Sequence, residues 1–142
     1  MRETSYFLDT NIFLRVIVRD DAKKVNECEA LLQAIMEKKI GAVTSHLVLS
    51  EIAWVGRGVY KMSKQEVVDA IRGIASIKNL KIRDRFNAFI ALEHFEAYKV
   101  KFIDALIASD SGFAKGELVI VSYDRDFDKL GVQRVEPDKV PL

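Results

Sequence analysis

The chain has 142 residues, the size of a single domain, and it is 49% hydrophobic and 30% charged. Its formal net charge of +1 excludes the strongly basic character of many nucleic-acid-binding domains, although a local patch or a metal could supply positive charge. One cysteine, Cys28, excludes an internal disulfide and a cysteine-ligated zinc cluster, and it agrees with a reducing, intracellular setting.

No proline-rich or glycine-rich linker divides the chain, because its two prolines, Pro137 and Pro141, both lie near the C-terminal end. Residues 1–142 are therefore expected to form one domain. No apolar stretch reaches the ~18 residues of a membrane-spanning helix, and the first residues lack the charged-then-apolar order of a secretory signal. We expect a cytoplasmic protein without a membrane partner.

Hydrophobic spacing in the first half of the chain predicts alternating strands and helices. We expect Gly56 and Gly58 to interrupt one helix near its end. Ser63 and Glu66 have capping-box spacing, which predicts that another helix begins there. Before that helix, the predicted elements are a strand over residues 5–9, helices over 10–19 and 22–39, a strand over 41–44 and a helix over 45–60.

The second half of the chain continues this alternation. The strand predicted over 118–122 is apolar throughout, which is typical of a strand buried on both faces. Strands that alternate with helices indicate an α/β fold, in which a mainly parallel sheet lies between layers of helices. The predicted elements are a strand over 80–83, a helix capped by Asp84 and ending near 98, a helix over 102–114, the strand over 118–122, a short helix ended by Gly131 and a strand over 132–135.

Four acidic residues lie in or at the end of apolar runs: Asp9, Glu51, Asp104 and Asp124. Acidic side chains are rarely fully buried without a partner, and the sequence offers no obvious base for each of them. A cation held between them is therefore the leading hypothesis. Asp9 and Asp124 also lie at or just past the carboxyl ends of predicted strands, where ligands gather in parallel sheets.

Each of these acids also has a simpler structural interpretation. Asp9 could be the N-cap of the following helix, whereas in the functional interpretation it is a metal ligand that Thr10 and Asn11 orient. Glu51 could lie on an exposed stripe, although its neighbours at helical spacing are apolar. Asp104 could cap the start of its own helix.

Three aspartates alternate after the strand predicted over 118–122. This segment lacks the glycine and the terminal glutamate of a calcium-binding loop. Asp124, next to the strand end, is the first ligand candidate, and Asp128, one helical turn further on, is the second. We expect Asp126 to be solvated, and also Asp110, which lies well round its helix from Asp104.

Other chemistries have little support in the sequence. The chain contains no Walker A loop, no H-E-x-x-H motif and no G-x-S-x-G motif. Cys28 and Trp54 fall at helical spacing among apolar residues, so we expect both in the core rather than Trp54 in a base-stacking platform. Asp9 could be the nucleophile of a phosphoryl-transfer domain, but Asn11 stands where a second acid would be needed. A non-catalytic binding module is the other alternative.

The acids belong to four motifs in a fixed order: Leu8-Asp9-Thr10-Asn11, Ser50-Glu51, Asp104-Ala105-Leu106-Ile107-Ala108 and Ser122-Tyr123-Asp124-Arg125-Asp126-Phe127. This ordered set resembles the PIN-domain family over nearly the whole chain, and in particular the toxins of prokaryotic VapBC-type toxin–antitoxin pairs. The resemblance implies a single PIN-like domain, a three-layer α/β/α sandwich with a central, mainly parallel sheet. It also implies an endoribonuclease that depends on Mg²⁺ or Mn²⁺.

The resemblance assigns roles to individual residues. The catalytic and metal-binding acids would be Asp9, Glu51, Asp104 and Asp124, with Asp128 as a further ligand. The supporting residues would be Thr10, Asn11 and Ser122. The residues that could meet the RNA backbone are Arg15, Arg57, Lys101 and Arg125.

The chemistry of such a site agrees with RNA cleavage. Bare carboxylates repel a phosphodiester, whereas a hard divalent cation prefers oxygen ligands and would lower the pKa of a bound water. We therefore expect hydrolysis that leaves a 5′-phosphate and a 3′-hydroxyl. The expected partners are RNA, a cognate antitoxin and a second copy of the chain, which could pack on the apolar face of Val67, Ile71 and Ile74. A stand-alone PIN-type nuclease in RNA processing is the nearest alternative.

Overall fold

The computed structural model describes residues 3–142, and its centre is a five-stranded sheet in the order β3-β2-β1-β4-β5. Every pair of neighbouring strands is parallel. The predicted α/β fold with a mainly parallel sheet is therefore confirmed, and the sheet of the described chain is parallel throughout. The strands are β1 (Ser5–Leu8), β2 (Gly41–Thr44), β3 (Leu80–Ile82), β4 (Leu118–Val121) and β5 (Arg134–Val135).

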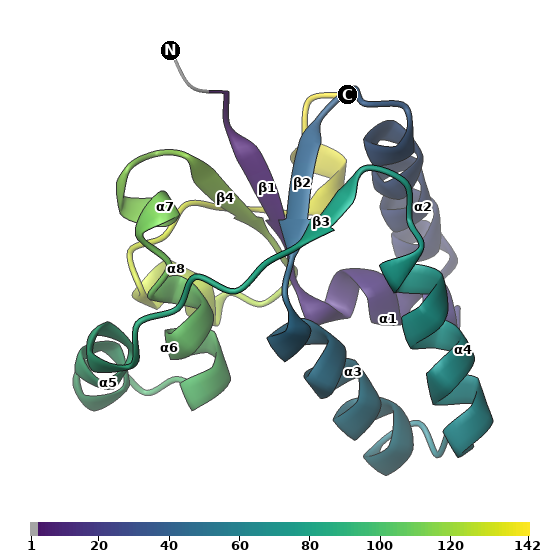
Figure 1. The fold of residues 1–142 in the computed structure, drawn as a ribbon, viewed down its shortest axis with the longest axis horizontal. Coiled ribbons are helices and arrows are strands. Elements are labelled where there is room, and N and C mark those ends of the chain that lie inside the picture. Colours follow the sequence, from purple (N-terminus) through teal and green to yellow (C-terminus); the bar gives the residue numbers. More distant parts are fainter. Residues whose placement is uncertain (1–2) are drawn as a thin grey trace.

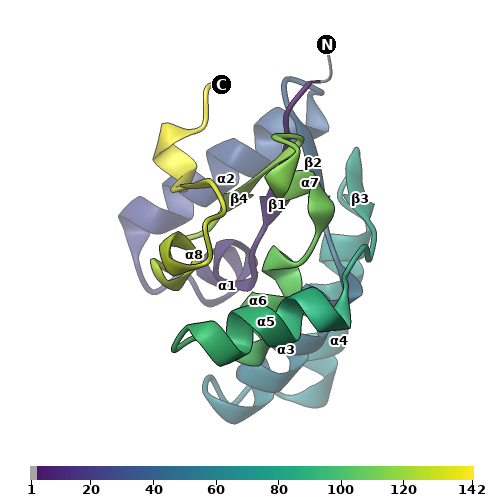
Figure 2. The same ribbon diagram turned by 90° about the vertical axis from the view of Figure 1, so that its left-hand side faces the viewer.

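Helices cover both faces of this sheet. Figure 1 shows α1, α2 and α4 on one side and α5, α6 and α7 on the other, which is a three-layer arrangement. Figure 2, turned by 90°, shows α5 lying across α6, against which it chiefly packs. The helices are α1 (Thr10–Val18), α2 (Ala22–Met36), α3 (His46–Gly58), α4 (Lys64–Ala75), α5 (Ala88–Ala97), α6 (Phe102–Ala108), α7 (Ser111–Ala114), α8 (Asp126–Lys129) and the 3₁₀ helix η1 (Pro137–Lys139).

The core lies between the sheet and these helices. All four residues of β4 are buried, as expected of a central strand covered on both faces. Cys28 of α2 is fully buried in the same cluster, which confirms its predicted place. Within residues 3–142, no helix is both long and apolar enough to cross a membrane.

Several helix boundaries differ from the prediction. Asn87, not Asp84, caps α5, because its side chain accepts hydrogen bonds from two backbone amides of the first turn. Asp84 instead accepts bonds from the backbone and the ring of His46. The helix predicted over 102–114 is divided into α6 and α7, since Asp110 begins a new helix as its N-cap. Helix α3 continues without interruption through Gly56 to Gly58.

Two expectations about apolar side chains were wrong. The face of α4 that we considered for a homodimer packs inside the protein, because Val67 and Ile74 are buried and Ile71 lies against the core. Trp54 of α3 was expected in the core, yet it is 81% exposed. A single helix turn of apolar spacing thus does not reveal which side of a helix faces the sheet.

Candidate metal centre

The predicted site lies where the neighbouring strands β1 and β4 end. Leu8 is paired with Val121 in the parallel register of β1 and β4, and the backbone N–H of Asp9 extends the ladder by donating to the Val121 carbonyl at 3.1 Å. This register places the Asp9 side chain beside Ser122, 113 residues further along the chain. Two of the sequence motifs therefore meet because β1 and β4 are neighbours.

Asp9 is held by hydrogen bonds on both carboxylate oxygens. Oδ1 accepts from the Thr10 N–H at 2.8 Å, which makes Asp9 the N-cap of α1. Oδ2 accepts from the Ser122 hydroxyl at 2.6 Å and from the Asn11 amide at 3.5 Å. Burial raises the pKa of Asp9 to about 6 although the bonds from Ser122 and Thr10 oppose the change, and the carboxylates of Glu51 and Asp124 raise it further.

Asp104 is the most strongly perturbed acid of the site. It is 2% exposed on α6, and its Oδ2 atom has no hydrogen-bond partner. Burial raises the pKa of Asp104 to about 8; the Lys101 ammonium opposes this shift, and the carboxylates of Asp9 and Asp124 add to it. The N-cap position of α6 is Lys101, so the alternative of Asp104 as a helix cap was wrong.

Asp124 and Asp126 extend from the loop after β4 toward Asp104. The N–H of Asp124 donates to the Ser122 hydroxyl at 3.0 Å, and the N–H of Asp126 donates to Oδ1 of Asp124 at 2.9 Å. One carboxylate oxygen from each of Asp104, Asp124 and Asp126 lies within 4.8 Å of the other two. Asp126, expected to be solvated, is thus half-buried and belongs to the acidic group; its spacing two residues after Asp124 was the available signal.

Two other aspartates lie outside the acidic group. Asp128, considered as a further ligand, is exposed and forms two hydrogen bonds to the guanidinium of Arg134, at 3.0 and 3.3 Å, which leave it outside the acidic group. Asp110, expected to be solvated, is 3% exposed. It caps α7 by accepting from the Gly112 N–H at 2.8 Å, and its carboxylate lies 3.9 Å from the guanidinium of Arg83.

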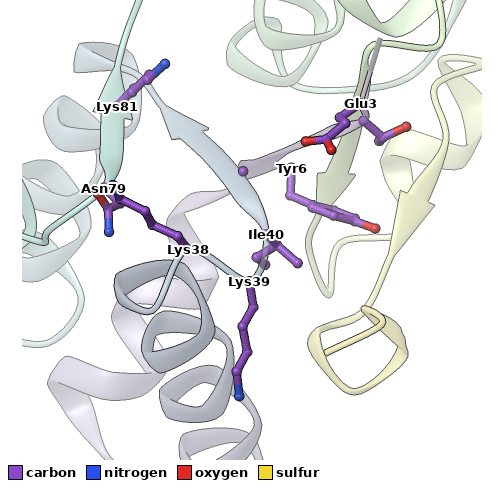
Figure 3. Close-up of a pocket in the computed structure, with 9 residues that line it drawn as sticks. Glu3, Tyr6, Lys38, Lys39, Ile40, Asn79 and Lys81 are labelled. Atoms are coloured by element: carbon purple, nitrogen blue, oxygen red, sulfur yellow. The ribbon is translucent and has the colours of Figure 1, made fainter. Parts of the chain in front are cut away.

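The four predicted acids share one cavity of about 140 Å³. Glu51 and Val55 reach it from α3, and Thr10, whose buried hydroxyl has no partner, reaches it from α1. A larger hollow of about 600 Å³ lies elsewhere, beside Tyr6 and the lysines around β2. Figure 3 shows the side chains of Lys39 and Lys81 pointing in different directions, so they do not converge on one ligand. The acidic cavity is lined by Asp9, Thr10, Asn11, Leu14, Glu51, Val55, Lys101, Asp104 and Asp124.

Of the four basic residues predicted to meet RNA, Lys101 lines the cavity. Burial lowers the pKa of Lys101, but nearby carboxylates, Asp104 first, raise it more, so the net shift is upward. Arg15 is bonded to Asp20 and to the Tyr60 hydroxyl instead. The two others, Arg57 and Arg125, are exposed outside the cavity lining.

Arg134 binds the backbone at the start of the acidic loop, a role that the sequence did not suggest. Its side chain is 12% exposed and donates to the Ser122 carbonyl at 3.0 Å. The same guanidinium pairs with the carboxylates of Asp128 and Glu136. A basic residue in a short predicted strand carried no signal of this role, because its partners are set by the β4–β5 pairing.

The cavity has the donors that a divalent cation requires. Mg²⁺ and Mn²⁺ prefer carboxylate oxygens, and a buried carboxylate oxygen without a partner is costly unless a cation or a proton satisfies it. Asp104, Asp124 and Asp126 lie close enough together to hold such an ion, and the Lys129 ammonium now contacts Asp126 at 3.1 Å. Glu51 lines the cavity together with Asp104 and Asp124. Asp9, with both oxygens engaged, has fewer free lone pairs.

Comparison with known proteins gives one family and a set of similar structures. The PIN domain family matches residues 6–133. VapBC2 of Rickettsia felis, bound to a promoter DNA fragment, is 22% identical, with a TM-score of 0.65 over 94% of this chain and 98% of that one. VapBC of Salmonella typhimurium, bound to DNA, is 17% identical, with a TM-score of 0.68 over 96% and 99%.

A third similar structure is VapC20 of Mycobacterium tuberculosis, described as a Sarcin-Ricin loop cleaving toxin. It is 19% identical, with a TM-score of 0.63 over 92% of this chain and 98% of that one. No curated protein matches the chain by sequence. These structures share the fold, and the family match spans nine-tenths of the described residues; the chain belongs to the PIN domain family.

Proposed function

We propose that this protein is a metal-dependent endoribonuclease and the toxin of a prokaryotic toxin–antitoxin pair. One observation carries the proposal: the buried, unpartnered carboxylate oxygen of Asp104 belongs to a cavity that Asp9, Glu51 and Asp124 share at the end of the central strands of a PIN domain. Such a cluster is unfavourable unless a cation or bound protons neutralise it.

The similar structures support the biological part of the proposal. Several are described as VapBC complexes, and FitAB is described bound to a DNA fragment. VapC20 is described as cleaving the Sarcin-Ricin loop. By likeness to these proteins, a cognate antitoxin is the proposed partner, RNA is the proposed substrate and the cytoplasm is the proposed location. A homodimer is also proposed, although the buried α4 face does not supply its interface.

The residues of the site form three groups with different proposed roles. Asp104, Asp124 and Glu51, with Asp126 beside them, would hold Mg²⁺ or Mn²⁺, which supplies a water of lowered pKa and neutralises phosphate charge.

Ser122 and the Thr10 N–H fix the Asp9 carboxylate, and the Asn11 amide also donates to the Ser122 oxygen at 3.1 Å. The Lys101 ammonium, in the cavity wall, would attract the phosphodiester. We expect products with a 5′-phosphate and a 3′-hydroxyl.

The alternatives fit the geometry less well. A phosphoryl-transfer domain would use Asp9 as a nucleophile, but both of its oxygens accept hydrogen bonds, and the Asn11 amide cannot shuttle a proton. A non-catalytic module would have its buried acids satisfied by protein groups, whereas Asp104 Oδ2 has no such partner in residues 3–142. A stand-alone RNA-processing nuclease has the same chemistry and differs in its partners.

Cleavage of a single-stranded RNA in Mg²⁺ or Mn²⁺ tests the enzymatic part. Wild type should cleave and Asp104→Asn should not, since asparagine supplies no anionic ligand. Asp69→Asn is the matched control, because Asp69 is exposed on α4 and lies outside the cavity. Equal cleavage by wild type and Asp104→Asn would identify a contaminant and refute the proposal.

Expression in a bacterial host tests the biological part. The wild-type protein should arrest growth, Asp104→Asn should not, and co-expression of the product of a short neighbouring reading frame should restore growth. An active nuclease that is not toxic, with no neighbouring gene that inhibits it, would favour the stand-alone nuclease.

A further inference from the structure

The most exposed large apolar side chain of residues 3–142 is that of Trp54, at 81%. It lies on α3 and is the only tryptophan in the sequence. A free indole presents a large flat surface to water, which is unfavourable unless a ligand covers it. The indole is therefore free to contact a ligand or a partner.

Trp54 lies on the helix that contributes two residues to the acidic cavity. Glu51 and Val55, on the same helix, line that cavity. At about 100° per residue, Trp54 lies only ~60° around the helix from Glu51, and its Cα is ~4.5 Å further along the axis. The indole is thus on the strip of α3 next to the one that faces the acids.

A shallow hollow of about 560 Å³ surrounds the indole. Besides Trp54 it is lined by Arg57, by the hydroxyl-bearing Ser50 and by the small residues Ala53 and Gly58. Arg57 forms no ion pair among the described residues, and its guanidinium makes a hydrogen bond only at 3.5 Å, to the Met62 carbonyl. The hollow therefore combines an aromatic face with a cation that has no carboxylate partner.

We propose that Trp54 stacks on a base of single-stranded RNA beside the scissile phosphate and so determines where the strand is held. Aromatic side chains bind unpaired bases by stacking, whereas cationic side chains follow the phosphates. Here the aromatic and the cation lie about one helical turn apart, on the helix that also carries Glu51. This inference rests on the proposed function, and Trp54 acts as a substrate-positioning residue and takes no part in the bond cleavage.

Because Trp54 is the only tryptophan, its fluorescence reports on this site directly. Asp104→Asn, which should bind RNA without cleaving it, is titrated with an unstructured RNA oligonucleotide in Mg²⁺. Stacking predicts a saturable quenching of the indole emission. An RNA with an abasic residue at the contacted position should quench less and bind more weakly.

Binding of a labelled RNA, followed by anisotropy, completes the test. The Trp54→Leu protein should bind RNA about tenfold more weakly than the protein that keeps Trp54. The RNA affinity of Trp54→Phe should fall between these two, since phenylalanine keeps an aromatic face. In wild-type background, Trp54→Leu should raise KM about tenfold with little change in kcat. The control is Phe89→Leu on α5, where an aromatic side chain of similar exposure, 79%, lies outside both hollows.

The competing possibility is that a protein covers the indole. Two results together would assign this surface to a second copy of the chain. The indole emission would be blue-shifted already without RNA and would not respond to RNA, and Trp54→Leu would lose the mass of a dimer. Asp104-dependent cleavage with unchanged KM and RNA affinity in Trp54→Leu would overturn this inference and leave the proposed function standing. Absence of both cleavage and RNA binding in the wild type would overturn both.

Discussion

Replacing Asp104 with asparagine should stabilise the metal-free protein at alkaline pH, although it should abolish cleavage. Burial raises the pKa of Asp104 from 3.8 to about 8. A carboxyl group with a raised pKa binds its proton more tightly in the folded state than in the unfolded state. Its contribution to stability is therefore greatest below pH 3.8, and it is lost as the pH rises through 8. Asparagine does not titrate, so the variant lacks this decline.

The size of the effect follows from the two pKa values. Each pH unit between them changes the free energy of unfolding by about 1.4 kcal/mol. Between pH 5 and pH 8 the wild type should therefore lose at most about 4 kcal/mol through Asp104. Asp9, with its pKa raised from 3.8 to about 6, adds a loss in the same direction at lower pH, and the variant retains that part.

Urea unfolding in EDTA at pH 5 and pH 8 measures this difference. The advantage of Asp104→Asn over wild type should be larger at pH 8 than at pH 5, while Asp69→Asn should follow wild type at both. Added Mg²⁺ should stabilise the wild type more than the variant, because the ion binds the folded carboxylates. A stability advantage of equal size at both pH values would show that burial does not raise the pKa of Asp104.

Three further predictions concern residues around the cavity. Ser122→Ala should reduce cleavage at pH 7 at least tenfold, because Asp9 loses its 2.6 Å hydrogen bond. The same loss should raise the apparent pKa of the acidic limb of the pH–rate profile. Ser122→Thr keeps the hydroxyl and should leave both the rate and this pKa unchanged. Asp126→Asn should weaken Mn²⁺ binding in calorimetry, whereas Asp128→Asn should leave it unchanged. Asn87→Ala should lower the free energy of unfolding by about 1 kcal/mol, since it removes the cap of α5.

The sequence predicted the fold and the gathering of four acids in one cavity because both depend on local signals. The continuous apolar run over β4 predicted a strand buried on both faces, and the structure confirms it. Asp9 and Asp124 follow strands, and the rule that ligands gather at the carboxyl ends of parallel strands needs no knowledge of strand order. The Ser63–Glu66 spacing likewise predicted a cap that forms within one turn.

What the sequence could not predict depends on contacts between distant segments. Asp110 and Asp126 looked alike as polar residues beside apolar ones. Asp110 is buried, accepts from the Gly112 N–H and lies near Arg83, whereas Asp126 belongs to the acidic group. The exposure of Trp54 depends on how α3 is rotated against the sheet. Helical spacing predicts that an apolar stripe exists, but tertiary packing determines how the helix is rotated about its axis.

Asp9 shows that a structural and a functional interpretation of one residue need not exclude each other. Its carboxylate caps α1 through Oδ1, as the simpler interpretation required, and it also lines the acidic cavity. Both of its oxygens are occupied by hydrogen bonds, whereas Asp104 has a buried oxygen with no partner. The unfavourable charge of the site is therefore concentrated on α6. A cation should relieve Asp104 first, with Asp9 fixed in advance by its bonds, which explains why removal of Asp104 is the sharper test of the site.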